Sequence, residues 1–355
     1  MTKAAGQYDI YYKIGQGSTA KVYLASNKQS GETVALKVIR LPEDEFAKQE
    51  KLAQIRNEVN IMSVLEHPGI VSIKDFFIEN NKIYVAMEFV GNGSLELYIH
   101  NRPMDIKTAL KYFSQIADAV FYLHTEAKIV HRDLKAENIL LTDCHQAKLS
   151  DFGLSRYLPQ DHEVLMKTRC GSPCYVAPEV ITSQGYSEKS DIWSLGILLF
   201  YMVTGHYPFI DENIQRLFHK ILEEPVPFPD FLKNDSELID LLNGMLQKEE
   251  KNRFTITQVV EHSCLKRLCT NKSVSLPHLN DYVPTRRKIS SVRTIGTTGA
   301  FNVSSLKNAA SIMATRRPKV MSLAPSCNMH LHAVQSIIQK KNRRRSIVLQ
   351  IAAPQ

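Results

Sequence analysis

The chain has 355 residues, of which 44% are hydrophobic and 23% are charged, so it can form two compact lobes or domains with ordinary globular cores. No apolar run reaches the roughly eighteen residues of a membrane-spanning helix, and the first residues lack the apolar core of a secretory signal. The six cysteines include no CxxC pair, which favours reduced thiols over a disulfide or zinc framework. We therefore expect a cytoplasmic protein, with the nucleus as a second location.

Charge is distributed unevenly along the chain. Residues 266–355 contain 16 lysines and arginines and a single acid, Asp281, whereas the net charge of the whole chain is only +8. This segment is rich in Ser, Thr and Arg and poor in aromatic residues, which is typical of disorder or of folding on binding. The pattern predicts a mildly acidic folded body followed by a basic tail.

Hydrophobic patterns predict a strand-rich front part with one helix and a mostly helical rear part. Strand character is expected over 11–24, 33–39, 70–78 and 82–89, and a helix over 48–65. The rear part begins with an amphipathic helix from Lys107 and continues with helices over 190–202 and 236–246.

A glycine-rich segment lies within the first strand region and contains Ile14, Gly15, Gln16, Gly17, Ser18, Thr19, Ala20, Lys21 and Val22. Glycine lets backbone N–H groups approach phosphate oxygens, although two glycines in a hairpin are more often a simple turn. Further along, Lys37 stands inside an apolar strand, where it needs a carboxylate partner unless it lies at a surface edge. Glu58 on the predicted front helix can supply that carboxylate.

Polar residues at fixed spacing follow the first rear helix, as His131-Arg132-Asp133-Leu134-Lys135-Ala136-Glu137-Asn138 and then Asp151-Phe152-Gly153. Phosphoryl transfer requires bound metal, a carboxylate near the nucleophile and cations against the phosphates. Asp133 can orient a substrate hydroxyl, and Lys135 can neutralise charge on the transferred group. Asn138 and Asp151 offer the oxygen ligands that Mg²⁺ prefers.

These motifs resemble those of the eukaryotic protein kinase family, and the resemblance extends over about residues 8–265, including Ala177-Pro178-Glu179 and Asp191 to Gly196. It implies an α+β, bilobal fold. A small β-rich N-lobe with one main helix would span about 8–87, a hinge 88–90, and a larger, mostly helical C-lobe about 91–265. The basic tail, 266–355, would lie outside this domain.

The resemblance further implies ATP and Mg²⁺ as cofactors, protein serine or threonine hydroxyls as acceptors, and named site residues. The catalytic residues would be Asp133, Lys135, Lys37 and Glu58, and the metal ligands Asn138 and Asp151. ATP would contact Ile14, Gly15, Gln16, Gly17, Ser18, Val22, Ala35, Lys37, Met87, Glu88, Val90 and Leu140. Structural roles would fall to Asp191 as anchor of the catalytic loop, to a Glu179–Arg253 pair, and to a hydrophobic stack of Phe152, His131, Met62 and Ile73.

Finer resemblances concern the kind of kinase. Lys135 and the segment 171–175 resemble serine/threonine kinases, in which Ser172 would bond Asp133 and Lys135. Residues 151–155 and 168–173 most resemble the AMP-activated-kinase-related branch of the calcium/calmodulin-dependent group. Ala20, in place of a third glycine, is a feature shared with polo-like kinases, which remain the alternative. Residues 266–355 are, however, too short and too polar for the substrate-binding module of that family.

Regulation and substrate choice rest on a few further residues. Thr168 is the expected phosphosite of an upstream kinase or of the chain itself, and its phosphate would pair with Arg132; an ordinary exposed threonine is the alternative. Ser94 and Tyr201 occupy places where relatives that select arginine often carry an acid, whereas Glu137 is acidic. Selection for basic substrates is therefore left open.

The tail carries two basic serine sites, Arg286–Ser290 and Arg343–Ser346. Leu331, Val334 and Ile338, followed by 340–345, could form a basic amphipathic helix that binds an acidic protein or an anionic membrane; a solvated tail is the alternative. No folded nucleic-acid-binding motif accompanies the charge. Three functions are open: an active kinase, a pseudokinase that only binds, and a basic adaptor. The presence of all the catalytic residues favours the first.

Overall fold

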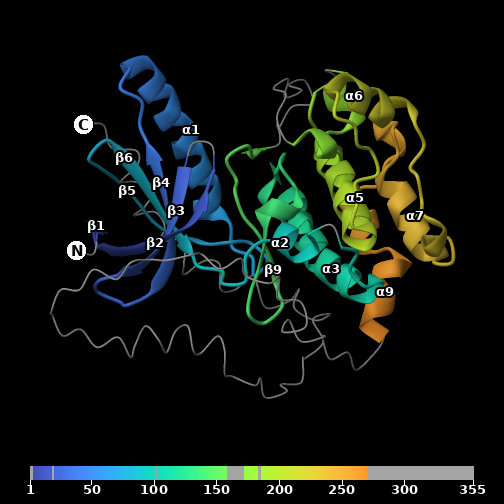
Figure 1. Ribbon diagram of the computed structural model, residues 1–355, viewed down its shortest axis with the longest axis horizontal. Helices are drawn as coiled ribbons and strands as arrows, with labels where there is room; N and C mark the ends of the chain where they lie inside the picture. The colour runs from blue at the N-terminus through green and yellow to red at the C-terminus, as the bar shows by residue number, and fades with distance from the viewer. Residues whose placement is uncertain (1–2, 18–19, 101, 158–171, 183–184, 271–355) are drawn as a thin grey trace. The chain divides into compact units, whose positions relative to one another are not determined.

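The computed structural model describes residues 3–17, 20–100, 102–157, 172–182 and 185–270 (Figure 1). These residues all belong to the first of two units into which the chain divides, and only this unit is described below. Ser18, Thr168 and nearly all of the predicted tail lie outside the described residues. Within them, the fold is α+β, with an antiparallel sheet in the N-lobe and helices in the C-lobe.

The N-lobe sheet has six strands in the order β1-β2-β3-β4-β6-β5. Their bounds are β1 Lys3–Ala5, β2 Tyr8–Gln16, β3 Ala20–Asn27, β4 Thr33–Arg40, β5 Ile73–Glu79 and β6 Lys82–Glu88. The strands predicted over 33–39 and 82–89 are confirmed, the predicted strand region 11–24 divides into β2 and β3, and residues 70–72 do not belong to β5. Ile70 instead forms a parallel bridge with Leu149 of the C-lobe, and the Val71 N–H donates to the Leu149 carbonyl at 2.9 Å.

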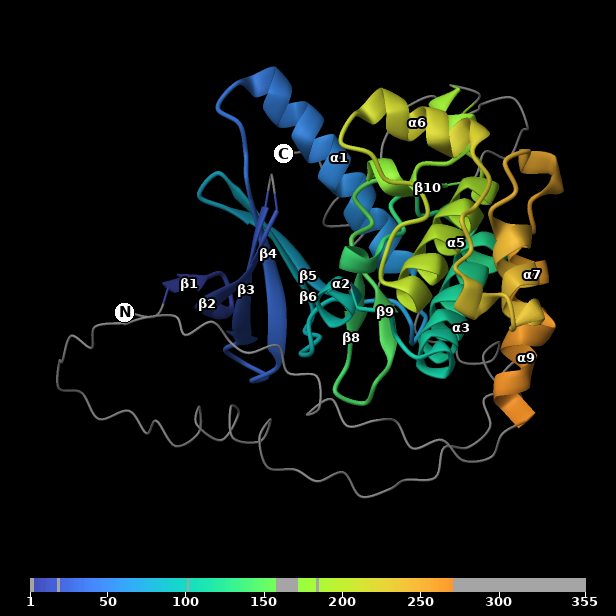
Figure 2. The ribbon, with the colours of Figure 1, turned by 45° about the vertical axis from the view of Figure 1, so that its right-hand side comes forward.

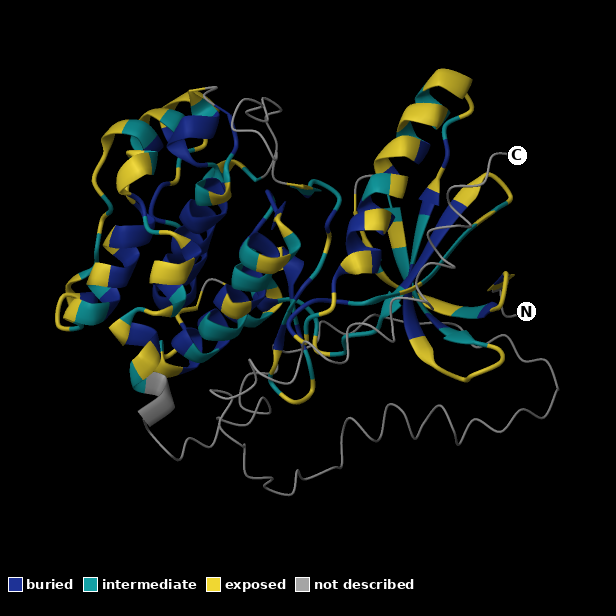
Figure 3. Ribbon diagram, turned by 180° about the vertical axis from the view of Figure 1, so that it is seen from behind, coloured by how far each residue is buried: buried dark blue, intermediate teal, exposed yellow. Residues whose placement is uncertain are grey.

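The single long helix of the N-lobe is α1, Glu45–Val64. It begins three residues before the predicted start, because Asp44 caps it by accepting a hydrogen bond from the Ala47 N–H at 2.8 Å. Its inner side buries Leu52, Ile55 and Val59 against β4 and β6, while its outer turns are exposed, as Figure 3 shows in yellow. Burial of this apolar stripe fixes α1 on the inner face of the sheet.

The C-lobe is built around α5, Glu188–Thr204, which is buried at every residue from Ser190 to Thr204. It is packed by α3, Ile106–Tyr122, and α7, Ser236–Met245. The helix predicted from Lys107 begins one residue earlier, and the helices predicted over 190–202 and 236–246 are confirmed within two residues at each end. The remaining α-helices of the described residues are α2 Leu95–Ile99, α4 Pro178–Ile181, α6 Ile214–Glu223, α8 Ile256–Val260 and α9 Ser263–Thr270. Figure 2 labels α2, α6 and α9. Among the residues described, no helix combines the length and apolarity needed to cross a membrane.

Two short antiparallel pairs of strands complete the C-lobe. β8, Ile139–Leu141, pairs with β9, Ala147–Leu149, and β7, Ile129–Val130, pairs with β10, Arg156–Tyr157. The first pair lies between the catalytic-loop residues and Asp151, so its register sets where Asp151 leaves the sheet. The second ties the segment after Asp151-Phe152-Gly153 to the strand just before His131.

The predicted Glu179–Arg253 pair is present and buried. Two guanidinium nitrogens of Arg253 donate to the two Glu179 oxygens, each at 2.8 Å, and the Ser190 hydroxyl donates to Glu179 at 2.6 Å. Burial tends to raise the pKa of Glu179, but Arg253 and Ser190 outweigh it and hold the pKa below its ordinary value. Since Glu179 is ionised although it is buried, the stability of the fold depends on the positive charge of Arg253.

We predict that Arg253→Met lowers the free energy of unfolding by about 3–5 kcal/mol, because Glu179 keeps its charge without its partner. The contribution is present above the ordinary glutamate pKa and is lost as pH falls through the depressed folded value. Urea unfolding at neutral pH and in acid measures both effects, and the loss should shrink in acid.

Lys233→Met is the matched control. Lys233 lies 2.6 Å from Asp230 on the surface, where both side chains are mostly exposed. A surface pair of this kind contributes little to stability, because solvent screens the charges. Equal losses in the two variants would contradict the assignment of Glu179–Arg253 as a buried structural pair.

Candidate active site

Lys37 lies on β4 and is held by two carboxylates. Its Nζ is 2.6 Å from Glu58 Oε1 on α1 and 3.3 Å from Asp151 Oδ1 after β9. Burial alone would lower the pKa of Lys37, but the two carboxylates outweigh it and raise the pKa above its ordinary value. The lysine is therefore charged, and the alternative of a surface-edge lysine is wrong.

Strand register explains why Lys37 faces α1. In an antiparallel sheet, directly opposed residues point to the same face, and Lys37 is opposed by Val22 of β3 and Val85 of β6. Val85 packs in the cluster that α1 covers, so Lys37 emerges on the same inner face. Glu58 projects toward it from the buried side of α1.

Asp151 is held in an unusual backbone conformation. Its φ of 60° lies in the left-handed region, which is rare for a residue other than glycine and is held here by the surrounding contacts. Burial tends to raise the pKa of its carboxyl, but Lys37 outweighs this effect and the pKa is lowered. The carboxylate of Asp151 is therefore ionised at neutral pH.

The catalytic loop is anchored by Asp191, as predicted. The carboxylate of Asp191 is fully buried on α5 and accepts hydrogen bonds from the backbone N–H of His131 at 2.8 Å and of Arg132 at 2.9 Å. His124 Nε2 lies 2.9 Å from the same carboxylate. These contacts hold the loop at Arg132, whose φ of 70° is also left-handed. His124 was missed by the sequence analysis.

Asp133, Lys135 and Asn138 form one polar group on this loop. Lys135 Nζ lies 2.8 Å from Asp133 Oδ2, and the Asn138 side-chain nitrogen donates to the same oxygen at 2.9 Å. Because an amide is planar, the Asn138 oxygen faces away from Asp133. The N–H of Ser150 donates to the Asn138 carbonyl at 2.8 Å, which places Asn138 beside the residue that precedes Asp151.

The side chains of Asn138 and Asp151 fit a hard divalent cation. They supply an amide oxygen and an ionised carboxylate, which are ligands that suit Mg²⁺. The neighbouring Lys37 is a fixed positive charge that suits a phosphate. Among the described residues, Ser172 forms no hydrogen bond with Asp133 or Lys135, and its backbone carbonyl accepts a hydrogen bond from the Tyr175 N–H.

The residues predicted to contact the adenine come from both lobes. Ala35 is opposed by Met87, and Val22 by Lys37, so these four side chains share the inner face of the sheet. Leu140 lies on β8 and forms a bridge with Ser94, just beyond the hinge. Ile14, Gly15, Gln16 and Gly17 belong to or follow β2, and Gly15 is opposed by Val22.

The hinge backbone has a particular pattern of hydrogen bonds. The N–H of Glu88 donates to the Ser72 carbonyl, and the N–H of Asn92 donates to the Leu141 carbonyl. Within the described structure, the backbone of 89–91 takes part in no hydrogen bond between these two anchors. Peptide groups of this segment are available to a base.

Hydrophobic contacts connect the two lobes behind the site. The rings of His131 and Phe152 meet edge to face at 4.9 Å, and both residues are fully buried. Met62 belongs to the same core cluster as Phe152, and Ile73 packs against it. Burial lowers the pKa of His131, so its ring is neutral.

Two side-chain pairs near the site were not foreseen. The hydroxyl of Tyr201 donates to Glu96 Oε1 at 3.1 Å. An acid from α2 therefore lies beside Tyr201, the position at which relatives that select arginine often carry an acid. Lys148 on β9 pairs with Glu88 at 2.9 Å. Lys148 stands between the buried apolar residues Ala147 and Leu149, and this is the same sequence signal that identified Lys37.

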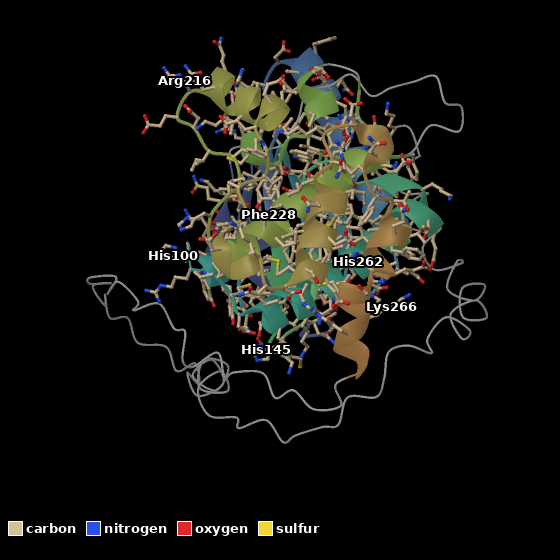
Figure 4. The ribbon with its side chains drawn as sticks, turned by 90° about the vertical axis from the view of Figure 1, so that its right-hand side faces the viewer. His100, His145, Arg216, Phe228, His262 and Lys266 are labelled. Carbon is tan, nitrogen blue, oxygen red and sulfur yellow. The ribbon has the colours of Figure 1, made fainter. Side chains whose placement is uncertain are left out.

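A surface depression of about 370 Å³ lies away from these residues, beside α7. Its lining includes Phe228, labelled in Figure 4, together with Lys233, Ser236, Ile239, Asp240 and Asn243. It contains none of the predicted site residues. The polar group around Lys37 and Asp133 remains the candidate active site.

Comparisons with known proteins identify the family of this chain. The family model described as protein kinase domain matches residues 8–265. The chain is 38% identical over 263 residues to CBL-interacting protein kinase 5 of Oryza sativa subsp. japonica, covering 74% of this chain and 56% of that protein. It is 39% identical over 264 residues to CBL-interacting serine/threonine-protein kinase 19 of Arabidopsis thaliana, covering 74% and 54%.

The chain thus spans about half the length of the curated relatives it matches. Their names do not support the polo-like comparison made from Ala20. The family match covers both lobes, from Tyr8 at the start of β2 to Leu265 in α9. This chain belongs to the protein kinase family.

Proposed function

We propose that this chain is a serine/threonine protein kinase that transfers the γ-phosphoryl group of ATP to hydroxyls of protein substrates. The observation that carries the proposal is that Lys37 contacts both Glu58 and Asp151, at 2.6 and 3.3 Å. One cation thereby joins α1, the sheet and the strand that leads to Asp151. The names of the similar proteins support serine and threonine as acceptors.

On this proposal the acceptor is positioned by the catalytic loop. Asp133 would accept a hydrogen bond from the substrate hydroxyl and orient its oxygen toward the phosphorus. The contacts from Lys135 and Asn138 fix Asp133 Oδ2, so its other oxygen is the one directed at the hydroxyl. Lys135 would also offset negative charge on the transferred group.

The nucleotide would be held by residues of both lobes. Lys37 would bind its phosphates, Val22, Ala35, Met87 and Leu140 would pack the base, and the backbone of 88–90 would hydrogen-bond it. Asn138 and Asp151 would hold Mg²⁺, which supplies positive charge to the phosphate oxygens when it is bound. The depressed pKa of Asp151 keeps that ligand ionised at neutral pH.

A pseudokinase is the second candidate function. It would keep the fold and bind partners without transfer, and such proteins commonly lack a catalytic group. Here the lysine, both carboxylates and the amide are present, and the Lys37–Glu58 contact is formed. These observations favour catalysis over binding alone.

We predict that the purified chain transfers labelled phosphate from Mg-ATP to a general serine/threonine substrate, and that Asp133→Asn lowers kcat by about 10²- to 10⁴-fold. The substitution keeps the shape of the side chain and removes its charge, so its unfolding transition should stay close to that of the parent. Phosphate incorporation per unit time is the measurement. Transfer that is equal in parent and variant would contradict the role of Asp133.

We also propose that phosphorylation of Thr168 raises activity. The position of Thr168 in the sequence supports this proposal, and so does Arg132. The backbone N–H of Arg132 donates to Asp191, and Arg132 directly precedes Asp133. A phosphate at Thr168 would pair with this guanidinium and order the substrate side of the loop.

Thr168→Ala is predicted to lower kcat by about tenfold or more, in line with a charge-assisted contact. Mass spectrometry gives the stoichiometry at Thr168, and activity is compared before and after phosphatase treatment. The parent should lose activity with its phosphate, whereas the variant should not respond. A Thr168→Ala variant that is as active as the phosphorylated parent would contradict activation through Thr168. If the parent phosphorylated at Thr168 transfers no phosphate, the pseudokinase is favoured.

A further inference from the structure

The side chain of Glu88 makes a set of contacts that the kinase motifs do not include. Its Oε1 lies 2.9 Å from Lys148 Nζ, and its Oε2 lies 3.2 Å from the same nitrogen. Ser72 also donates to Oε2, from its N–H at 3.3 Å and from its hydroxyl at 3.4 Å. We call Glu88, Lys148 and Ser72 the hinge clamp.

The hinge clamp joins three segments that are distant in the sequence. Glu88 is the last residue of β6, Ser72 precedes β5, and Lys148 is the middle residue of β9. The Lys148 side chain is only 12% exposed and that of Glu88 is 29% exposed. Contacts at this degree of burial are screened less by solvent than those of a surface pair, so they can fix the relative position of the three segments.

The position of Lys148 connects the clamp to the predicted adenine residues. Lys148 is directly opposed by Leu140 in the β8–β9 pair, so the two side chains point to one face of this hairpin. From that face Lys148 reaches the carboxylate of Glu88. The clamp therefore lies between the C-lobe residue expected to pack the base and the strand that leads into the hinge.

Backbone contacts show what the clamp adds. The far end of the hinge is fixed by two hydrogen bonds with Leu141, from the Asn92 N–H at 3.1 Å and to the Gly93 carbonyl at 2.9 Å. The near end is fixed by the pairing of β6 with β4, which reaches Val34 opposite Glu88, and by the hydrogen bond from the Glu88 N–H to the Ser72 carbonyl at 2.8 Å. The clamp adds side-chain contacts at this end. The segment between the two ends, 89–91, depends on both anchors for its position.

The strand β9, which carries Lys148, also determines the position of Asp151. Beside Lys148, the Leu149 N–H donates to the Gly69 carbonyl at 2.7 Å and its carbonyl accepts from the Val71 N–H at 2.9 Å. Asp151 follows two residues later. A shift of β9 relative to the hinge would therefore move the predicted base site and the predicted metal ligand with respect to each other.

We propose that the hinge clamp positions the hinge backbone for the nucleotide base, with Lys148 and the Glu88 carboxylate as positioning residues. The inference rests on the proposed function, since it assigns a role within the same nucleotide site. It differs from the backbone role expected of Glu88, because here the side chain acts. An ordinary stabilising ion pair is the alternative, and it would affect unfolding without affecting nucleotide binding.

The test measures binding of ADP by calorimetry to the full chain and to Lys148→Met, which keeps the length of the apolar stem and removes the charge. We expect Kd for ADP to rise by about tenfold, as is typical when residues that orient a binding group are lost. KM for ATP should rise in parallel, while kcat at saturating ATP should change by less than about twofold, because binding to ground and transition states is lost equally.

Two further variants sharpen the result. Lys148→Arg keeps a cation within reach of Glu88 and should restore most of the affinity. Lys74→Met is the matched control, since Lys74 of the N-lobe also pairs with a glutamate, Glu32, at 2.9 Å, but with both side chains more exposed. It should leave Kd for ADP unchanged.

A double-mutant cycle that combines Lys148→Met with Glu88→Gln distinguishes the hinge clamp from an ordinary stabilising ion pair. Non-additive losses of ADP affinity would support the clamp as one unit. Unchanged Kd with a lowered unfolding temperature, or tighter binding in Lys148→Met, would overturn the proposal. Because ADP binding needs no phosphoryl transfer, a chain that binds ADP but transfers no phosphate contradicts the proposed function and leaves this test intact.

Discussion

The buried ammonium group of Lys37 is the constraint on which the site depends. A lysine on the apolar inner face of a sheet loses hydration, and it stays charged only because carboxylates offset that loss. Glu58 comes from α1 and Asp151 from the end of β9, so the requirement of one cation fixes two distant elements. The relative position of the sheet, the helix and the predicted metal ligand follows from this single charge.

In the C-lobe, the buried carboxylate of Asp191 constrains the structure in the same way as Lys37 does in the N-lobe. Asp191 is satisfied by two backbone N–H groups and a histidine, so the loop that carries Asp133 cannot relax without leaving a buried carboxylate unpaired. Left-handed backbone at Arg132 and Asp151 costs about 1–3 kcal/mol each, and such strain persists only where surrounding contacts outweigh it. Rigid α5 and the Lys37 contacts supply that restraint on either side of the site.

Much of this arrangement could be predicted from the sequence where the signal is local. Lys37 in an apolar strand indicated a buried, paired cation, and the stripe of Leu52, Ile55 and Val59 indicated α1. The three-residue strand β1 was missed because its pattern is too short to recognise. Residues 70–72 read as part of a strand, yet Ile70 and Val71 contact Leu149 of β9, and no local pattern reveals a partner nearly eighty residues away. Lys148 carries the same signal as Lys37, but the local sequence does not reveal its partner, because Glu88 is sixty residues away.

If Asp151 and its neighbours hold a metal-bound nucleotide, the binding of ADP must depend on Mg²⁺. ADP binding to the parent chain and to Asp151→Asn is measured by calorimetry with and without Mg²⁺. The parent should bind ADP more tightly when Mg²⁺ is present, and Asp151→Asn should lose most of this difference. A parent chain whose affinity for ADP does not respond to Mg²⁺, or a variant that responds as the parent does, would contradict the account.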